Sequence, residues 1–152
     1  MVGRGVAGRA GSEGGRAAAA GTTGITTAIL APLKAGDHVV ASKALFGSCL
    51  YVVQDLLPRY GIETTLVDGL DLDQWQRALR PNTKTSFLES PTNPTLDVPD
   101  IGPTAKLAHS RGARLIVANA FATPTRHRPP SPGPDPGAAA TPTPTHRHSR
   151  LP

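Results

Sequence analysis

The fold is decided by residues 38–69, HVVASKALFGSCLYVVQDLLPRYGIETTLVDG, in which a helical pattern lies between two short apolar runs. The runs His38–Ala41 and Glu63–Val67 predict strands, because short apolar and β-branched stretches bounded by turn residues are typical of buried strands. Between them, Gly47–Tyr60 repeats apolar residues at helical spacing, and Gly61 provides a stop. The stretch therefore predicts a strand–helix–strand unit with parallel strands.

The same alternation continues on both sides of this unit. A helix is expected before it, over Thr22–Leu33. After it, the pattern predicts a helix at Asp71–Leu79, a strand at Thr85–Leu88, a helix at Asp100–Ser110 and a strand at Arg114–Val117. Strands that alternate with helices in this way predict an α/β fold, with a mostly parallel sheet that carries helices on both faces.

The two ends of the 152-residue chain have a different composition. Residues 1–20 hold six glycines and an alanine run, and residues 124–152 hold nine of the 16 prolines. Such segments bury too little apolar surface to offset their ordering entropy. We therefore expect a flexible segment at 1–20, one folded segment at 21–123, and a disordered or polyproline-like tail at 124–152.

The positive charge also belongs to the two ends. The formal net charge is +5, and residues 21–123 contain nine basic and nine acidic side chains. The folded segment therefore gives no reason to expect a nucleic-acid partner. Weak polyanion binding by the flanks stays an alternative, although no aromatic residues interleave with their arginines to stack on bases.

The remaining composition points away from membranes and metals. No run approaches the roughly 18 apolar residues of a membrane helix, and a signal peptide is not recognisable, so a cytoplasmic protein is expected. The single Cys49 fits that compartment and is expected to pack in the core. The tail histidines lack a fixed geometry, and Asp68, Asp71 and Asp73 read as a turn and helix cap, so no metal site is expected.

Chemistry is expected in the loops that follow the strands, because α/β sheets bind ligands at the carboxyl ends of their strands. Three loops qualify: Ser42–Ser48, Glu89–Thr95 and Ala118–Pro124. In the second loop Asn93 lies between a turn and Pro94, which suits a rigid amide aimed into a crevice. An ordinary asparagine turn explains the same residues.

Four runs in these regions resemble one family. They are LAPLKAGDHVVASKALFGSC (30–49), LLPRYGIETTLVDG (56–69), FLESPTNPT (87–95) and LIVANAFATP (115–124). Together they resemble the large domain of the Cys/Met-metabolism enzymes that depend on pyridoxal phosphate, nearest to the O-succinylhomoserine sulfhydrylase and cystathionine γ-synthase branch. The resemblance covers residues 17–124 and implies part of an aspartate-aminotransferase-like (fold type I) domain.

The resemblance implies a cofactor site. Gly21 and Thr22 match the helix start whose amides hold the cofactor phosphate. Phe46 matches the aromatic ring that stacks on the pyridine, although core packing would also explain an aromatic residue there. Asn93 matches the amide that approaches the phenolic oxygen of the cofactor and the substrate carboxylate. Ala118 occupies the position of the family aspartate that pairs with the pyridinium nitrogen.

Two departures from the family pattern bear on activity. A methyl group at Ala118 cannot hold the pyridinium proton. The Schiff-base lysine of the family lies in a Ser-x-Thr-Lys segment, and none of Lys34, Lys43, Lys84 and Lys106 matches it, so no catalytic residue is assigned.

The resemblance therefore implies a pyridoxal-phosphate-dependent trans-sulfuration lineage in methionine biosynthesis. Its members act on small amino-acid substrates, O-acylhomoserines among them, and form homo-oligomers, and this chain is expected to be catalytically incomplete. The alternative is a non-catalytic product, truncated by a frameshift near Pro124, that misfolds or associates with an intact subunit.

Overall fold

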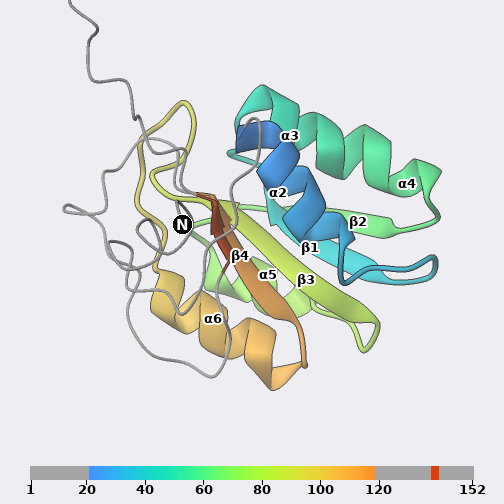
Figure 1. Cartoon of the computed structure of the whole chain (residues 1–152). Coiled ribbons are helices and arrows are strands. Elements are labelled where there is room, and N and C mark those ends of the chain that lie inside the picture. Colours follow the sequence, from blue (N-terminus) through green and yellow to red (C-terminus); the bar gives the residue numbers. More distant parts are fainter. Residues whose placement is uncertain (1–20, 119–137, 141–152) are drawn as a thin grey trace, which may run out of the picture.

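A computed structural model of the chain describes residues 21–118 and 138–140. Its centre is a five-stranded sheet in the order β2-β1-β3-β4-β5, with every neighbouring pair parallel (Figure 1). The strands are β1 (His38–Ser42), β2 (Glu63–Val67), β3 (Thr83–Glu89), β4 (Arg114–Ala118) and β5 (Ala138–Ala140). The parallel sheet expected from the alternating pattern is confirmed.

Strand β5 corrects one expectation about the tail. Ala138–Ala140 pairs in parallel with Ile116–Ala118 of β4, so the prediction of a disordered or polyproline-like segment is wrong for these three residues. The ladder uses backbone N–H and C=O groups, which alanine supplies as well as any residue, and it covers an edge that β4 would otherwise leave open. The other residues of the tail lie outside the described part of the chain.

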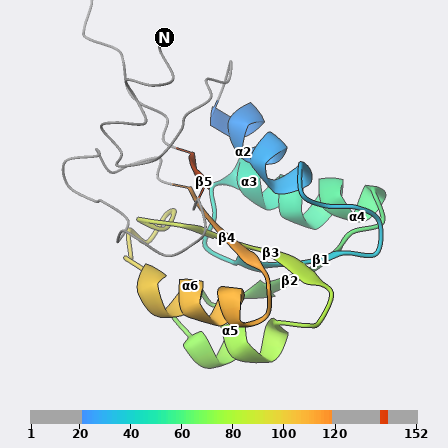
Figure 2. The same cartoon turned by 60° about the horizontal axis from the view of Figure 1, so that its bottom comes forward.

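Helices cover both faces of the sheet, as expected (Figure 2). They are α2 (Gly21–Leu30), α3 (Gly47–Tyr51), the π-helical segment η1 (Val52–Leu56), α4 (Leu57–Arg59), α5 (Leu72–Ala78) and α6 (Ile101–Ser110). The first four pack on one face, and α5 and α6 pack on the other. Each face therefore has its own apolar core.

The helix predicted over residues 47–60 is present, but its middle is wider than an α-helix. The N–H of Leu57 donates to the carbonyl of Val52, five residues back. Pro58 explains the change, because it has no N–H for the carbonyl of Gln54 and its ring would crowd that carbonyl. One wider turn accommodates the proline without ending the helix.

The two cores have different aromatic centres. Phe87 of β3 is fully buried among Ile29 of α2, Val53 of η1 and their neighbours. On the opposite face Trp75 of α5 packs against the sheet, and its indole N–H donates to the carbonyl of Gly69 at 3.3 Å. Burial of large apolar side chains on both faces holds the three layers together.

The start of α5 settles the role of the aspartates that follow β2. Asp71 Oδ1 accepts the N–H groups of Asp73 at 2.9 Å and Gln74 at 3.1 Å, which makes Asp71 the N-cap of this helix. The turn and cap expected from the sequence are confirmed, because a side-chain oxygen satisfies amides that have no partner within the helix. None of the described helices is long and apolar enough to cross a membrane.

Candidate functional site

The chain path changes direction between the neighbouring strands β1 and β3. From β1 the chain passes through α3 to one face of the sheet, whereas from β3 it passes through α6 to the other face (Figures 1 and 2). In parallel α/β sheets, the point where neighbouring strands send their connections to opposite faces is where ligands bind, at the carboxyl ends of the strands. We call this side of the sheet the carboxyl edge.

Phe46 lies at the carboxyl edge. It is the residue before α3, in the loop that leaves β1, and its side chain is 50% exposed. The backbone of Phe46 is fixed on both sides: its carbonyl accepts the N–H groups of Cys49 and Leu50, and its own N–H donates to Glu89 Oε2 at 2.7 Å. The core-packing explanation for Phe46 is wrong, because half of the side-chain surface faces solvent.

Asn93 lies in the loop that leaves β3, the strand next to β1. It is partly buried in a turn that closes on itself, with the N–H of Thr92 donating to the carbonyl of Asp97 at 2.8 Å and the N–H of Leu96 donating to Thr92. The hydroxyls of Thr92 and Thr95 are 2.7 Å apart. These hydrogen bonds close the loop around Asn93.

Gly21 and Thr22 form the first turn of α2, which runs antiparallel to the strand that follows it and therefore begins at the carboxyl edge (Figure 1). The helix contacts α3 and the strands β4 and β5. The first amides of a helix have no partner within it, and they carry the positive end of the helix dipole. This edge of the sheet therefore offers an anion a set of main-chain donors.

Ala118 is the last residue of β4 and is buried. It pairs in register with Glu89, the last residue of β3, so the two side chains lie side by side on the same face of the sheet. The N–H of Ser90 donates to the carbonyl of Ala118 at 2.9 Å, which ties the two strand ends together. The position that the resemblance assigns to the family aspartate therefore lies at the carboxyl end of β4.

Glu89 is the residue of this edge that the sequence interpretation did not single out. It is 1% exposed, and burial raises the pKa of its carboxyl group, while the hydrogen bond from Phe46 opposes that rise. Among the described acidic residues it is the buried one at the carboxyl edge. The signal was a charged residue directly after the apolar run Ser86–Leu88, where a buried strand ends.

Comparison with known proteins identifies the family. The model of the family described as Cys/Met metabolism PLP-dependent enzyme matches residues 3–136. The chain belongs to this family. The extent expected for the resemblance, residues 17–124, was too narrow at both ends.

Relatives of the Cys/Met-metabolism family agree in sequence and in structure. The O-succinylhomoserine sulfhydrylase of Mycobacterium tuberculosis is 46% identical over 108 residues, which are 71% of this chain and 27% of that protein. The L-methionine gamma-lyase of Porphyromonas gingivalis is 43% identical over 121 residues, 77% of this chain and 30% of that protein. The solved O-acetylhomoserine sulfhydrylase of Wolinella succinogenes superposes with a TM-score of 0.78 at 35% identity, over 82% of this chain and 35% of that one.

These matches confirm that the sheet is part of the larger domain of a pyridoxal-phosphate-dependent trans-sulfuration enzyme. The chain spans between a quarter and about a third of the length of these relatives. Its lineage is that of methionine metabolism, and the family depends on pyridoxal phosphate.

The geometry fits the family's cofactor at three positions and not at the fourth. The start of α2 offers amides to a phosphate, Phe46 presents an exposed ring, and Asn93 is held in a closed loop at the same edge. At Ala118, the fourth position, a buried methyl group offers no acceptor for a ring N–H.

The four lysines lie in different places around the Cys/Met-family domain. Lys34 and Lys84 are at the amino ends of β1 and β3, and Lys106 is on the exposed side of α6. Lys43 follows β1 at the carboxyl edge, where its backbone N–H donates to the carbonyl of Val67 at 2.8 Å and its side chain is exposed. Lys84 is exposed.

Cys49 packs in the core, as predicted. It lies on α3 and is 3% exposed, and burial, with the nearby Glu89 carboxylate, raises the pKa of its thiol. A thiol that stays protonated is a poor nucleophile. Among residues 21–118 and 138–140, no three His, Cys, Asp or Glu side chains are grouped so that they could hold a metal ion.

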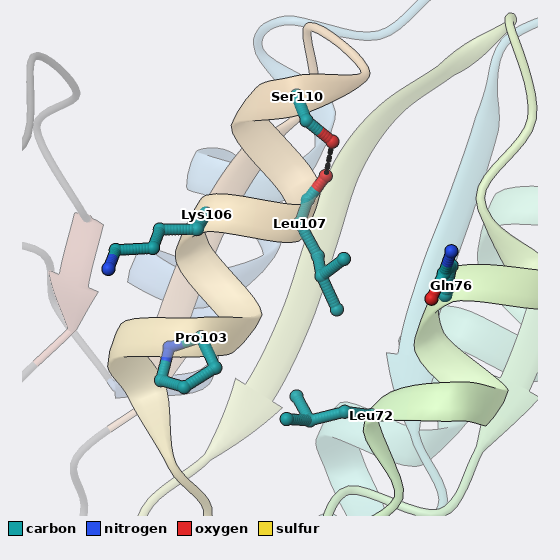
Figure 3. A pocket seen from close by; sticks show the side chains of 6 residues that line it. All are labelled: Leu72, Gln76, Pro103, Lys106, Leu107 and Ser110. Atoms are coloured by element: carbon teal, nitrogen blue, oxygen red, sulfur yellow. Dashed lines mark hydrogen bonds between the residues drawn. The ribbon is translucent and has the colours of Figure 1, made fainter.

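A separate hollow of about 390 Å³ lies between α5 and α6 (Figure 3). It is lined by Leu72, Gln76, Pro103, Lys106, Leu107 and Ser110. The Ser110 hydroxyl is used within α6, where it donates to the carbonyl of Leu107 at 2.7 Å. Because convergent polar groups mark a ligand site and this hollow has few, the carboxyl edge is the stronger candidate.

Proposed function

We propose that residues 21–118 form part of the pyridoxal-phosphate site of a trans-sulfuration enzyme that acts on an O-acylhomoserine. The observation that supports this most is the convergence, at the carboxyl edge, of the α2 start, Phe46, Asn93 and Ala118. They come from four separate parts of the sequence. The names of the sulfhydrylase relatives support the choice of substrate class.

Each position would make a different contact with the cofactor. The first amides of α2 would hold the phosphate, because they have no acceptor within the helix and lie at the positive end of its dipole. The Phe46 ring would stack on one face of the pyridine. The Asn93 amide would donate to the phenolic oxygen or to the substrate carboxylate. When bound, the cofactor supplies an electron-withdrawing ring for carbanionic chemistry on the amino acid.

We further propose that turnover by this chain is weak. A protonated ring nitrogen withdraws electrons best, and a carboxylate is what keeps that nitrogen protonated. Ala118 removes this acceptor, because its buried side chain is a methyl group. Homocysteine formed at the rate of an intact sulfhydrylase would contradict this part of the proposal.

Titration of the purified full chain with pyridoxal phosphate, followed by its absorbance and by calorimetry, tests the cofactor site. Wild type is expected to bind saturably, and Ala118→Asp is expected to bind about tenfold more tightly, because a charge-assisted hydrogen bond is gained. Ala118→Asn has nearly the same shape without the charge and should show a much smaller gain. Saturable binding by neither wild type nor Ala118→Asp would contradict the proposal.

A second candidate is a non-catalytic subunit that associates with a longer family member. The observation that favours it is a group of exposed apolar side chains in loops at the carboxyl edge: Leu70 is 54% exposed, Leu96 63% and Val98 57%. Exposed apolar groups of this kind mark association surfaces. Co-purification of the two chains would support this candidate, and a folded monomer that ignores a full-length relative would contradict it.

A further inference from the structure

The hydrogen bond between Glu89 and Phe46 joins two loops that leave neighbouring strands. Glu89 ends β3, and Phe46 precedes α3 in the connection that leaves β1. The bond is short, 2.7 Å from the Phe46 nitrogen to Glu89 Oε2, and it spans 43 positions of sequence. It therefore links the connection that leaves β1 to the end of β3, the strand that pairs with β1.

Burial of the Glu89 carboxylate costs free energy, which indicates that this residue has a role at its position. An ionised carboxylate loses much of its hydration when buried, and this loss is large unless charges or donors compensate for it. The described residues include no ion pair to Glu89, since the ion pair found among them joins Arg80 and Glu63. The compensation that the described residues supply is the backbone donor of Phe46.

The bond fixes the Phe46 backbone while the ring stays exposed. The Phe46 carbonyl accepts Cys49 N–H at 2.8 Å and Leu50 N–H at 2.9 Å, so Glu89 takes the remaining polar group of that residue. The side chain of Phe46 makes no cap to α3 and is 50% exposed. A rigid backbone that carries a free ring is the arrangement that a stacking platform needs, because it lowers the entropy lost on binding.

Glu89 is also connected to Ala118 and Asn93 at the carboxyl edge. Its register partner on β4 is Ala118, and the next residue, Ser90, donates its N–H to the Ala118 carbonyl. Asn93 follows four residues later in the same loop. A displacement of Glu89 would therefore change the positions of three residues that are proposed to contact the cofactor: Phe46, Asn93 and Ala118.

We infer that Glu89 is a positioning residue of the cofactor site: its carboxylate anchors the Phe46 amide and thereby sets the place of the Phe46 ring over the carboxyl edge. The hydrogen bond from the Phe46 N–H to Glu89, which we call the anchor, does not depend on a ligand. The effect of the anchor on cofactor affinity rests on the proposed function. The inference differs from a role in stability alone, because it requires that Glu89 act on the cofactor through Phe46.

Hydrogen exchange of the Phe46 amide, followed by NMR on the full chain, tests the anchor. In Glu89→Ala the amide is expected to exchange at least about tenfold faster than in wild type, because its hydrogen bond is lost. Glu89→Gln keeps an oxygen at the same reach and should stay within about threefold of wild type. If Glu89→Ala does not fold, Glu89→Asp replaces it, since the shorter carboxylate keeps the charge and cannot reach. An unchanged Phe46 amide in the variant used would overturn the inference.

Pyridoxal phosphate titration of a double-mutant cycle tests the path through Phe46. Glu89→Ala should weaken binding about tenfold in the wild-type background and by less than about twofold in the Phe46→Ala background, because the ring through which Glu89 acts is then absent. Ser86→Ala, on the same strand, is the control and should leave affinity unchanged. Equal losses in the two backgrounds would overturn the inference. If wild type does not bind the cofactor, the proposed function fails, and the exchange of the Phe46 amide decides the anchor alone.

Discussion

His38 and Thr83 face each other across strands β1 and β3, with 2.8 Å between His38 Nδ1 and Thr83 Oγ1. The other ring nitrogen of His38 is 2.9 Å from Thr65 Oγ1, and Thr83 Oγ1 also accepts the N–H of Arg80 at 2.8 Å. His38 and Thr83 are fully buried. The amino ends of β1, β2 and β3 are thus joined by one polar network, far from the carboxyl edge.

Two threonines of β3 should respond in opposite directions to the same substitution. Thr83→Val is expected to lower the free energy of unfolding by about 1–3 kcal/mol, because it leaves buried partners without a hydrogen bond. The Thr85 hydroxyl is buried with no partner among the described residues, so Thr85→Val should raise the free energy of unfolding by about 1 kcal/mol. Urea denaturation of both variants measures the pair. A loss of stability in Thr85→Val equal to that in Thr83→Val would refute the assigned hydrogen bonds.

The same network predicts a loss of stability in mild acid. Burial, and secondarily the positive charge of Arg80, lowers the pKa of His38 below its usual 6.5, so the unfolded chain takes up the His38 proton first as pH falls. The His38 contribution is therefore fully present above about pH 6.5 and decreases from there down to the pKa of the folded state. Urea denaturation between pH 7.5 and 5.5 should show a steeper fall in wild type than in His38→Gln. Parallel curves would count against a neutral, buried His38.

Gly69 should not tolerate a side chain. A Cβ at this position would lie 2.7 Å from Ser42 Oγ, which accepts the N–H of Ala44 at 3.2 Å in the loop toward Phe46. Gly69→Ala is therefore expected to lower the free energy of unfolding by about 1–3 kcal/mol. Ser42→Ala removes the oxygen and should restore part of that loss in the double variant. Additive losses measured by thermal unfolding would show that the contact is not the cause.

Two exposed aromatic residues in the same connection allow a matched test of the stacking platform. Phe46→Leu is expected to weaken pyridoxal phosphate binding about three- to tenfold, because the aromatic component of stacking is lost while an apolar side chain remains. Tyr51 is 48% exposed at the end of α3, and Tyr51→Leu should leave the affinity unchanged. Fluorescence quenching by the cofactor measures both variants. A larger loss of affinity in Tyr51→Leu than in Phe46→Leu would contradict a cofactor site at Phe46.

Much of the fold could be predicted from particular runs of residues. His38–Ala41, Glu63–Val67 and Arg114–Val117 are apolar or β-branched over the length of a strand, and each lies in the strand that was expected. Strand β5 could not be predicted, because Ala138–Ala140 has no strand-like pattern and pairs only through its backbone with an edge that exists once β4 is in place.

For the candidate site, the sequence by itself determined the residue types: an aromatic residue at Phe46, an amide before Pro94, and a methyl group where the family has a carboxylate. Tertiary structure alone decided that β1 and β3 send their chains to opposite faces of the sheet, and that Glu89 is buried with a hydrogen bond to Phe46. The physical reason is that the spacing of apolar residues along a helix or strand shows which of its faces is buried, because many side chains contribute to that burial. A single hydrogen bond between residues 43 positions apart depends instead on strand order and register, which no local run of residues encodes.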